Sequence, residues 1–150
     1  DWISVAQDEA RHFLMMRERL RQLGFDYGDF PAHNGLWEAA EKTAHDVLVR
    51  MACVPRVLEA RGLDVTPPMI KRLREVRDLE TVAVLEIILA EEVRHVEIGT
   101  RWFRWCCAQR ELDPVSTFRR LLGEQGIVLR PPFNHSARRQ AGFWPEELPQ

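Results

Sequence analysis

Two short stretches of the chain repeat one arrangement of residues that can bind a metal ion. The sequences "DEARHF" (8–13) and "EEVRHV" (91–96) each contain a Glu, a His three residues later, a second acid directly before the Glu and an Arg directly before the His. Carboxylate oxygens and imidazole nitrogens form a ligand set for iron or manganese. A Glu-x-x-His motif on each of two helices is also the pattern of two-metal sites inside helical bundles. The repeat therefore predicts one shared metal site.

Each motif continues an apolar stripe with helical spacing. The stripes belong to a first predicted helix, about residues 1–23, and to a long one, about residues 78–110. The spacing of three residues places the Glu and the His of a motif on one helix face, in line with the apolar residues. A carboxylate buried without a partner costs several kcal/mol. We therefore predict that the two pairs converge on metal, with the ligands Glu9, His12, Glu92 and His95.

A third predicted helix, about residues 35–61, offers one more carboxylate. Glu59 lies on its apolar stripe with Leu48, Ala52 and Pro55. Pro55 has no N–H to bond to the preceding turn, so we expect it to kink the helix one turn before Glu59. We predict Glu59 as the fifth metal ligand.

The acids that precede the two motif glutamates have a predicted role of their own. A histidine bound to a metal usually donates its outer N–H to a carboxylate. We expect Asp8 and Glu91 to accept this N–H from the histidine of the neighbouring helix.

A charge count suggests one further ligand. Two divalent ions carry four positive charges, and Glu9, Glu59 and Glu92 supply three negative ones. The chain begins at Asp1 without a Met and already in a helical pattern. We expect the fourth carboxylate to come from a helix that precedes Asp1.

Simpler readings of these residues exist. The two motifs could be surface faces on which Glu, Arg and His form ion pairs at helical spacing. Glu59 lies near a predicted helix end, where an exposed Glu is common.

The predicted fold is all-α and forms a single domain over residues 1–150, built as a four-helix bundle whose first helix is missing. The loop at 24–34 is expected to cross over, so that the first two long helices run roughly parallel. Gly62 should end the second helix, and Thr66 should cap a short helix that begins at Pro67. Another short helix is predicted in "DPVSTFRRLL", followed by an irregular tail, residues 123–150, that packs on the bundle.

Charge, hydropathy and cysteine content argue against several classes of protein. The formal net charge is −2 with acids and bases interspersed, which gives no electrostatic case for nucleic acid or an anionic membrane. No apolar run approaches the roughly 20 residues that span a bilayer, and no signal peptide is visible. The three cysteines contain no CxxC pair, which favours buried thiols in a reducing cytoplasm.

The longer motifs resemble an uncharacterised bacterial family of ferritin-like di-iron domain proteins. The stretches that carry the resemblance are "DEARHF", "YGDFPAHNGLWE", "RVLEARGLDVTP", "EEVRHVEIGTRWF" and "PPFNHSARRQAGF". More distantly the chain is similar to the di-iron tRNA hydroxylases, which share a motif of the type "LEARG" (58–62). The resemblance implies metal ligands at Glu9, His12, Glu59, Glu92 and His95, with a further Glu upstream.

The leading functional hypothesis is an oxidoreductase that binds two iron ions and activates dioxygen to oxidise or hydroxylate an unidentified substrate. Its electron donor is unidentified, manganese could replace iron, and a homo-oligomer is compatible with the sequence. One rival is a non-catalytic module that binds iron or manganese. The other is a helical structural domain that binds no metal.

Overall fold

The computed structural model describes residues 1–148, and these are helical without any strand, which confirms the all-α prediction. The last two residues of the predicted tail, Pro149 and Gln150, lie outside the described residues. The elements are α1 (Trp2–Gln22), α2 (Gly35–Lys42), α3 (Val47–Cys53), the π-helical turn η1 (Val54–Glu59), α4 (Ala60–Glu75), α5 (Leu79–Gln109), α6 (Pro114–Glu124), α7 (His135–Gln140) and the 3₁₀ turn η2 (Pro145–Glu147).

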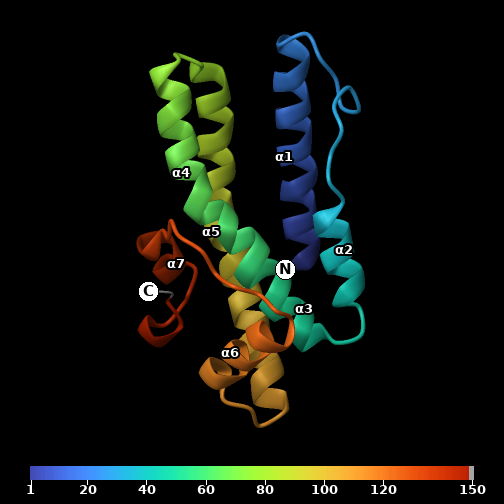
Figure 1. The fold of residues 1–150 in the computed structure, drawn as a ribbon, viewed down its shortest axis with the longest axis vertical. Helices are drawn as coiled ribbons and strands as arrows, with labels where there is room; N and C mark the ends of the chain where they lie inside the picture. The colour runs from blue at the N-terminus through green and yellow to red at the C-terminus, as the bar shows by residue number, and fades with distance from the viewer. Residues whose placement is uncertain (149–150) are drawn as a thin grey trace.

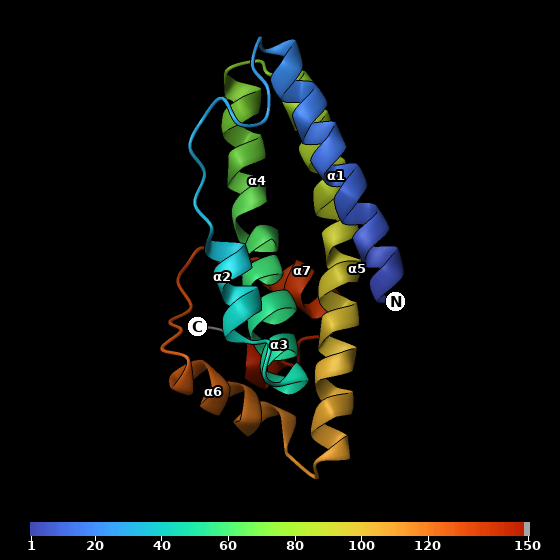
Figure 2. The same cartoon turned by 90° about the vertical axis from the view of Figure 1, so that its right-hand side faces the viewer.

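Three long helical segments make up the body of the molecule. In Figure 1, α1 and the continuous segment α3–η1–α4 run upward, and α5 runs down beside them. Figure 2 shows α1 lying along the upper half of α5. Helix α5 is central, because it contacts α1, α3, η1, α4, α6 and α7.

The connection from α1 to α3 returns along α1, as expected for a crossover, but it is longer than predicted (Figure 1). The prediction of one helix over residues 35–61 is wrong, since the chain leaves the helical path between α2 and α3. The Thr43 hydroxyl donates to the Ala39 carbonyl at 2.7 Å, and Asp46 Oδ1 accepts from the Leu48 N–H at 2.8 Å. These contacts close one helix and cap the next. Asn34, which directly precedes α2, makes no side-chain capping bond.

The predicted break after Gly62 is also wrong, because α4 continues to Glu75 with Pro67 and Pro68 inside it. A proline in a helix leaves the carbonyl four residues earlier without its usual donor. For Pro67 this is the carbonyl of Leu63, and Asn134 Nδ2 donates to it at 3.2 Å. A side chain from the C-terminal segment therefore replaces the missing bond.

Pro55 lies in the π turn η1, which takes the place of the predicted kink. The turn packs closely on α5, where a Cβ built on Gly99 would lie 2.1 Å from the Cβ of Pro55. Only a residue without a side chain fits at that position of α5.

The main core joins α3, η1, α4, α5, α6 and the C-terminal segment, and its members include Leu48, Leu63, Phe103, Phe118 and Phe143. A smaller cluster of Ile70, Val82 and Leu85 fastens α4 to α5.

The apolar face of helix α1 is less buried than the sequence pattern predicts. Only Val5 and His12 of this helix are buried, whereas Phe13 and Met16 are 44% and 40% exposed. No helix within residues 1–148 is long and apolar enough to cross a membrane.

Candidate metal centre

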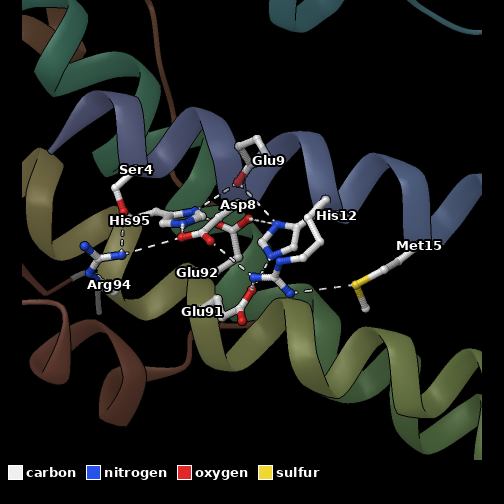
Figure 3. A network of polar contacts seen from close by, with 10 residues as sticks. Ser4, Asp8, Glu9, His12, Met15, Glu91, Glu92, Arg94 and His95 are labelled. Carbon is white, nitrogen blue, oxygen red and sulfur yellow. Dashed lines mark hydrogen bonds and ion pairs between the residues drawn. The ribbon is translucent and has the colours of Figure 1, made fainter.

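The two Glu-x-x-His motifs meet where α1 lies on α5 (Figure 3). Glu9 and His12 come from α1, and Glu92 and His95 come from α5. One ligand-capable atom of each residue lies within 4.8 Å of those of the other three. Both histidines are buried, Glu92 is half-buried and Glu9 is exposed. The structure thus brings together four of the five predicted ligands.

The outer nitrogens of the two histidines form a crossed pair of contacts between the helices. His12 Nε2 of α1 lies 2.6 Å from Glu91 Oε2 of α5, and His95 Nε2 of α5 lies 3.1 Å from Asp8 Oδ2 of α1. Because a carboxylate only accepts, each Nε2 carries the proton and donates it. This places Asp8 and Glu91 as the sequence predicts, each beside the histidine of the other helix.

The inner nitrogens of both histidines point into the centre. His12 Nδ1, His95 Nδ1 and Glu92 Oε2 are buried, and none makes a hydrogen bond of ordinary geometry to a described residue. Glu9 Oε1 lies 2.9 Å from His95 Nδ1, but not in line with it. Buried polar atoms are normally satisfied. A metal ion bound between these atoms would satisfy all of them, so the residues fit such a group.

Glu59, the last residue of η1, lies close enough to Glu92, Glu9 and His95 for their charges to act on it, although it is outside the group of four. Its Oε2 is buried and has no hydrogen-bond partner among the described residues. Burial, together with the negative charges of Glu92 and Glu9, raises the pKa of Glu59 to about 7. A carboxylate kept this close to others without a partner is typical of a functional site.

The charge balance of the centre also suits a cation. The close carboxylates of Glu9 and then of Glu92 raise the pKa of His95 to about 10, although burial acts in the opposite direction. The neighbouring His95 in turn lowers the pKa of Glu9. The metal-free centre therefore holds a proton on His95 among carboxylates at neutral pH. A metal ion would replace the positive charge of that proton.

The arginines that precede the two histidines support the outer acids. Arg11 Nη2 lies 2.5 Å from Glu91 Oε2 and 3.2 Å from Asp8 Oδ1. Arg94 Nη1 lies 3.5 Å from Asp8 Oδ2. Contacts with His95 and then Arg11 lower the pKa of Asp8, and contacts with His12 and then Arg11 lower the pKa of Glu91. Both acids are therefore held as acceptors for the imidazole N–H groups.

Sequence reasoning missed one feature that positions the centre. Gly99 lies one helical turn after His95 and admits Pro55, which lies one turn before Glu59. The contact sets the register of η1 against α5 and so places Glu59 level with His95. A glycine on the inward face of a long helix was the only signal in the sequence.

The fold and the site define a class of protein. It is an all-helical domain with a largely buried Glu/His group that could hold a metal ion. Residues 1–149 match the family described as "Protein of unknown function (DUF455)", and the chain belongs to this family. It is also similar to an "Uncharacterized protein" of Haemophilus influenzae, with 48% identity over 149 residues. That match covers 99% of the chain and 52% of the relative, so the chain spans about half the length of the curated relative it matches. No solved structure matches the chain.

Proposed function

We propose that this chain is a ferritin-like di-iron carboxylate domain whose metal ligands are Glu9, His12, Glu59, Glu92 and His95. The observation that carries the proposal is the orientation of the two buried histidines. Each donates its outer N–H to a carboxylate of the other helix. Each also directs its Nδ1, which has no hydrogen-bond partner among the described residues, at Glu9 and Glu92. This is how metal-binding histidines are commonly held.

The position of the two motif glutamates supports two ions instead of one. Glu9 Oε1 lies 3.4 Å from His12 Nδ1 and 2.9 Å from His95 Nδ1. Oxygens of Glu92 lie 3.9 Å from His12 Nδ1 and 3.7 Å from His95 Nδ1. Each carboxylate therefore lies near both imidazoles, so Glu9 and Glu92 would hold the ions together with the two histidines. Glu59 would complete the shell from the third helical segment.

The arrangement of the long helices is compatible with a ferritin-like bundle. Helices α1 and α4 run in the same direction, with a crossover between α1 and α3, and α5 runs antiparallel to them (Figure 1). In bundles of this class the ligands come from facing helices and include a Glu-x-x-His motif on two of them. We further propose that the fourth carboxylate of the charge count lies in the part of the full-length protein that is outside these 150 residues.

The proposed reaction is the oxidation or hydroxylation of an unidentified organic substrate. An iron pair in such a carboxylate shell supplies the activation of dioxygen. The chain's own residues would hold the ligands in place and manage protons. In the metal-free centre Glu59, whose pKa is raised to about 7, can take up or release a proton near neutral pH. The carboxylate of Glu9 is 49% exposed and marks the side of the centre that is open to solvent.

The test is to load the full-length protein with Fe(II) without oxygen, and then to add dioxygen. We expect bound iron, a near-ultraviolet absorption of oxidised iron, and dioxygen uptake that repeats when a reductant is supplied. Uptake that stops after one round would favour a non-catalytic iron-binding module. If the protein binds neither iron nor manganese, the proposal is wrong.

A further inference from the structure

We propose that a cluster of charges where η1 and α5 meet the C-terminal segment positions Glu59. The cluster consists of Arg56, Arg104 and Glu147, and is called the tail clamp below. The inference rests on the proposed function in one respect only, namely that Glu59 is a metal ligand. The clamp would hold the π turn η1 in the one register that directs Glu59 at the centre.

The clamp is fully enclosed on the side of η1. The side chains of Arg56 and Glu147 are both 0% exposed, and Arg56 Nη2 lies 2.6 Å from Glu147 Oε1. The second carboxylate oxygen of Glu147 accepts from Arg104 Nη2 at 3.1 Å and from the Trp144 backbone N–H at 2.9 Å. Residues that are 91 positions apart in the chain are thereby joined.

The rest of the Arg56 guanidinium is surrounded by aromatic rings. Its central carbon lies 4.5 Å, 4.2 Å and 4.6 Å from the ring centres of Phe103, Phe118 and Phe143. Its Nε and Nη1 make no hydrogen bond to a described residue. Glu147 is therefore the only hydrogen-bonding partner that the described residues offer this arginine side chain, and it fixes where the guanidinium lies.

Arg56 and Glu59 belong to the same six-residue π turn, and they face different parts of the molecule. Arg56 donates to Glu147 of the C-terminal segment, whereas Glu59 has a buried Oε2 and lies near enough to Glu92 and Glu9 for their charges to act on it. An α-helix turns by about 100° per residue, whereas a π turn holds more residues per turn. If η1 reverted to α-helix, Arg56 and Glu59 could no longer face these two places together. Fixing Arg56 therefore fixes Glu59.

A buried ion pair is a weak source of stability, because the loss of hydration offsets most of the attraction. Its better-supported effect is to select one arrangement among several. The π turn is where such a choice arises, since π turns are rare and occur mostly as single turns at functional sites. The contact of Pro55 with Gly99 sets the height of η1 along α5, and the clamp would set its rotation.

The test uses the double variant Arg56→Met/Glu147→Gln, which removes both enclosed charges and keeps similar volumes. Two quantities would be measured in the full-length protein. The first is amide hydrogen exchange of residues 54–59 in the metal-free state, and the second is iron bound per chain. We expect exchange at 54–59 to become about tenfold faster or more. We expect the weaker of the two iron-binding steps to lose about tenfold or more in affinity.

The chain offers a matched control in a second buried ion pair of the same C-terminal segment. Arg138 Nη2 lies 2.6 Å from Asp64 Oδ2, with side chains 1% and 0% exposed, but Asp64 lies in α4 beyond the π turn. The variant Asp64→Asn/Arg138→Met should speed exchange around residues 134–140 and leave both η1 and iron binding as in the wild type. Glu147→Gln alone, which keeps the size of the side chain, serves if the clamp variant does not fold.

The outcomes separate the two proposals. Wild-type exchange at 54–59 and wild-type iron binding in a folded clamp variant would overturn the inference, as would equal losses in the control. If the wild type binds no metal, the proposed function fails, and the exchange measurement still decides whether the clamp orders η1.

Discussion

His95 of α5 donates its outer N–H to Asp8 of α1, with 3.1 Å between Nε2 and Oδ2. The reverse pair, His12 with Glu91, spans the same interface at 2.6 Å. The acid that precedes each motif glutamate therefore holds the histidine of the other motif. This crossed pairing explains why each repeat contains a second acid directly before its Glu.

Replacing the outer acids should weaken metal binding without removing a ligand. Loss of such a hydrogen-bond partner typically lowers metal affinity by about 10- to 100-fold. We expect Asp8→Ala and Glu91→Ala each to fall in this range in competition titrations with a chelator. Glu97→Ala is the control, because Glu97 lies on the same helix as Glu91, is 43% exposed and, among the described residues, forms an ion pair only with Arg101. Affinities equal to those of the control would contradict the role of the crossed pairs.

Replacing Glu59 should stabilise the metal-free protein and impair the metal-bound one. A pKa raised from 4.5 to about 7 means that the folded state holds a proton the unfolded state has already lost. The free energy of unfolding therefore falls as pH rises from about 4.5 to 7, and stays lower above pH 7. Glu59→Gln removes this penalty, so we expect a gain of about 1–3 kcal/mol at pH 8 in metal-free denaturant titrations.

The same variant should bind less iron. The gain in the free energy of unfolding of Glu59→Gln over the wild type should be larger at pH 8 than at pH 4.5. An equal gain at both pH values would show that Glu59 is not held at the centre as described.

Metal binding should release protons in a number that depends on pH. With a pKa of about 10, His95 is protonated in the metal-free protein at pH 8 and must lose that proton to bind a metal. Glu59, with a pKa of about 7, adds a second proton below neutrality. From these two groups we expect about one proton released at pH 8 and nearly two at pH 6. Titration calorimetry in buffers of different ionisation enthalpy measures this number, and equal release at both pH values would refute the assignment.

Adding one methyl group at Gly99 should disturb the centre from one helical turn away. The new Cβ would lie 2.1 Å from the Cβ of Pro55, so η1 or α5 must move. We expect Gly99→Ala to lower the free energy of unfolding by about 1–3 kcal/mol and to reduce iron binding. Gly62→Ala is the matched control, because nothing lies within 4 Å of its Cβ position in α4. It should raise stability by about 0.4–1 kcal/mol, and a similar gain for Gly99→Ala would contradict the close packing described here.

The all-α class and the meeting of the two motifs could be predicted from the sequence. Both depend on helical periodicity, which shows for each helix separately which residues face inward. Glu9, His12, Glu92 and His95 lie on stripes that are visible in the residues themselves. The extent to which α1 is buried was less predictable, since Phe13 lies on the apolar stripe of this helix and yet is exposed.

The path between Gly35 and Glu75 could not be predicted, because distant residues determine it. Local sequence predicts a helix start at Pro67, but the Leu63 carbonyl that this proline leaves free accepts from Asn134, which is 71 positions away. The π turn likewise depends on Gly99 and Glu147, which no local pattern links to Pro55 or Arg56.

The central claim is that the two motifs together hold a pair of metal ions, and metal content per chain tests it most directly. The full-length protein, its His12→Ala variant and its His95→Ala variant would be loaded with Fe(II) without oxygen, freed of unbound metal and analysed by elemental mass spectrometry. His33→Ala, which changes an exposed histidine, serves as the control. The account predicts two iron ions per chain in the wild type and the control, and the loss of two-metal binding in both motif variants. A wild type without bound metal, or motif variants that load as fully as the control, would contradict it.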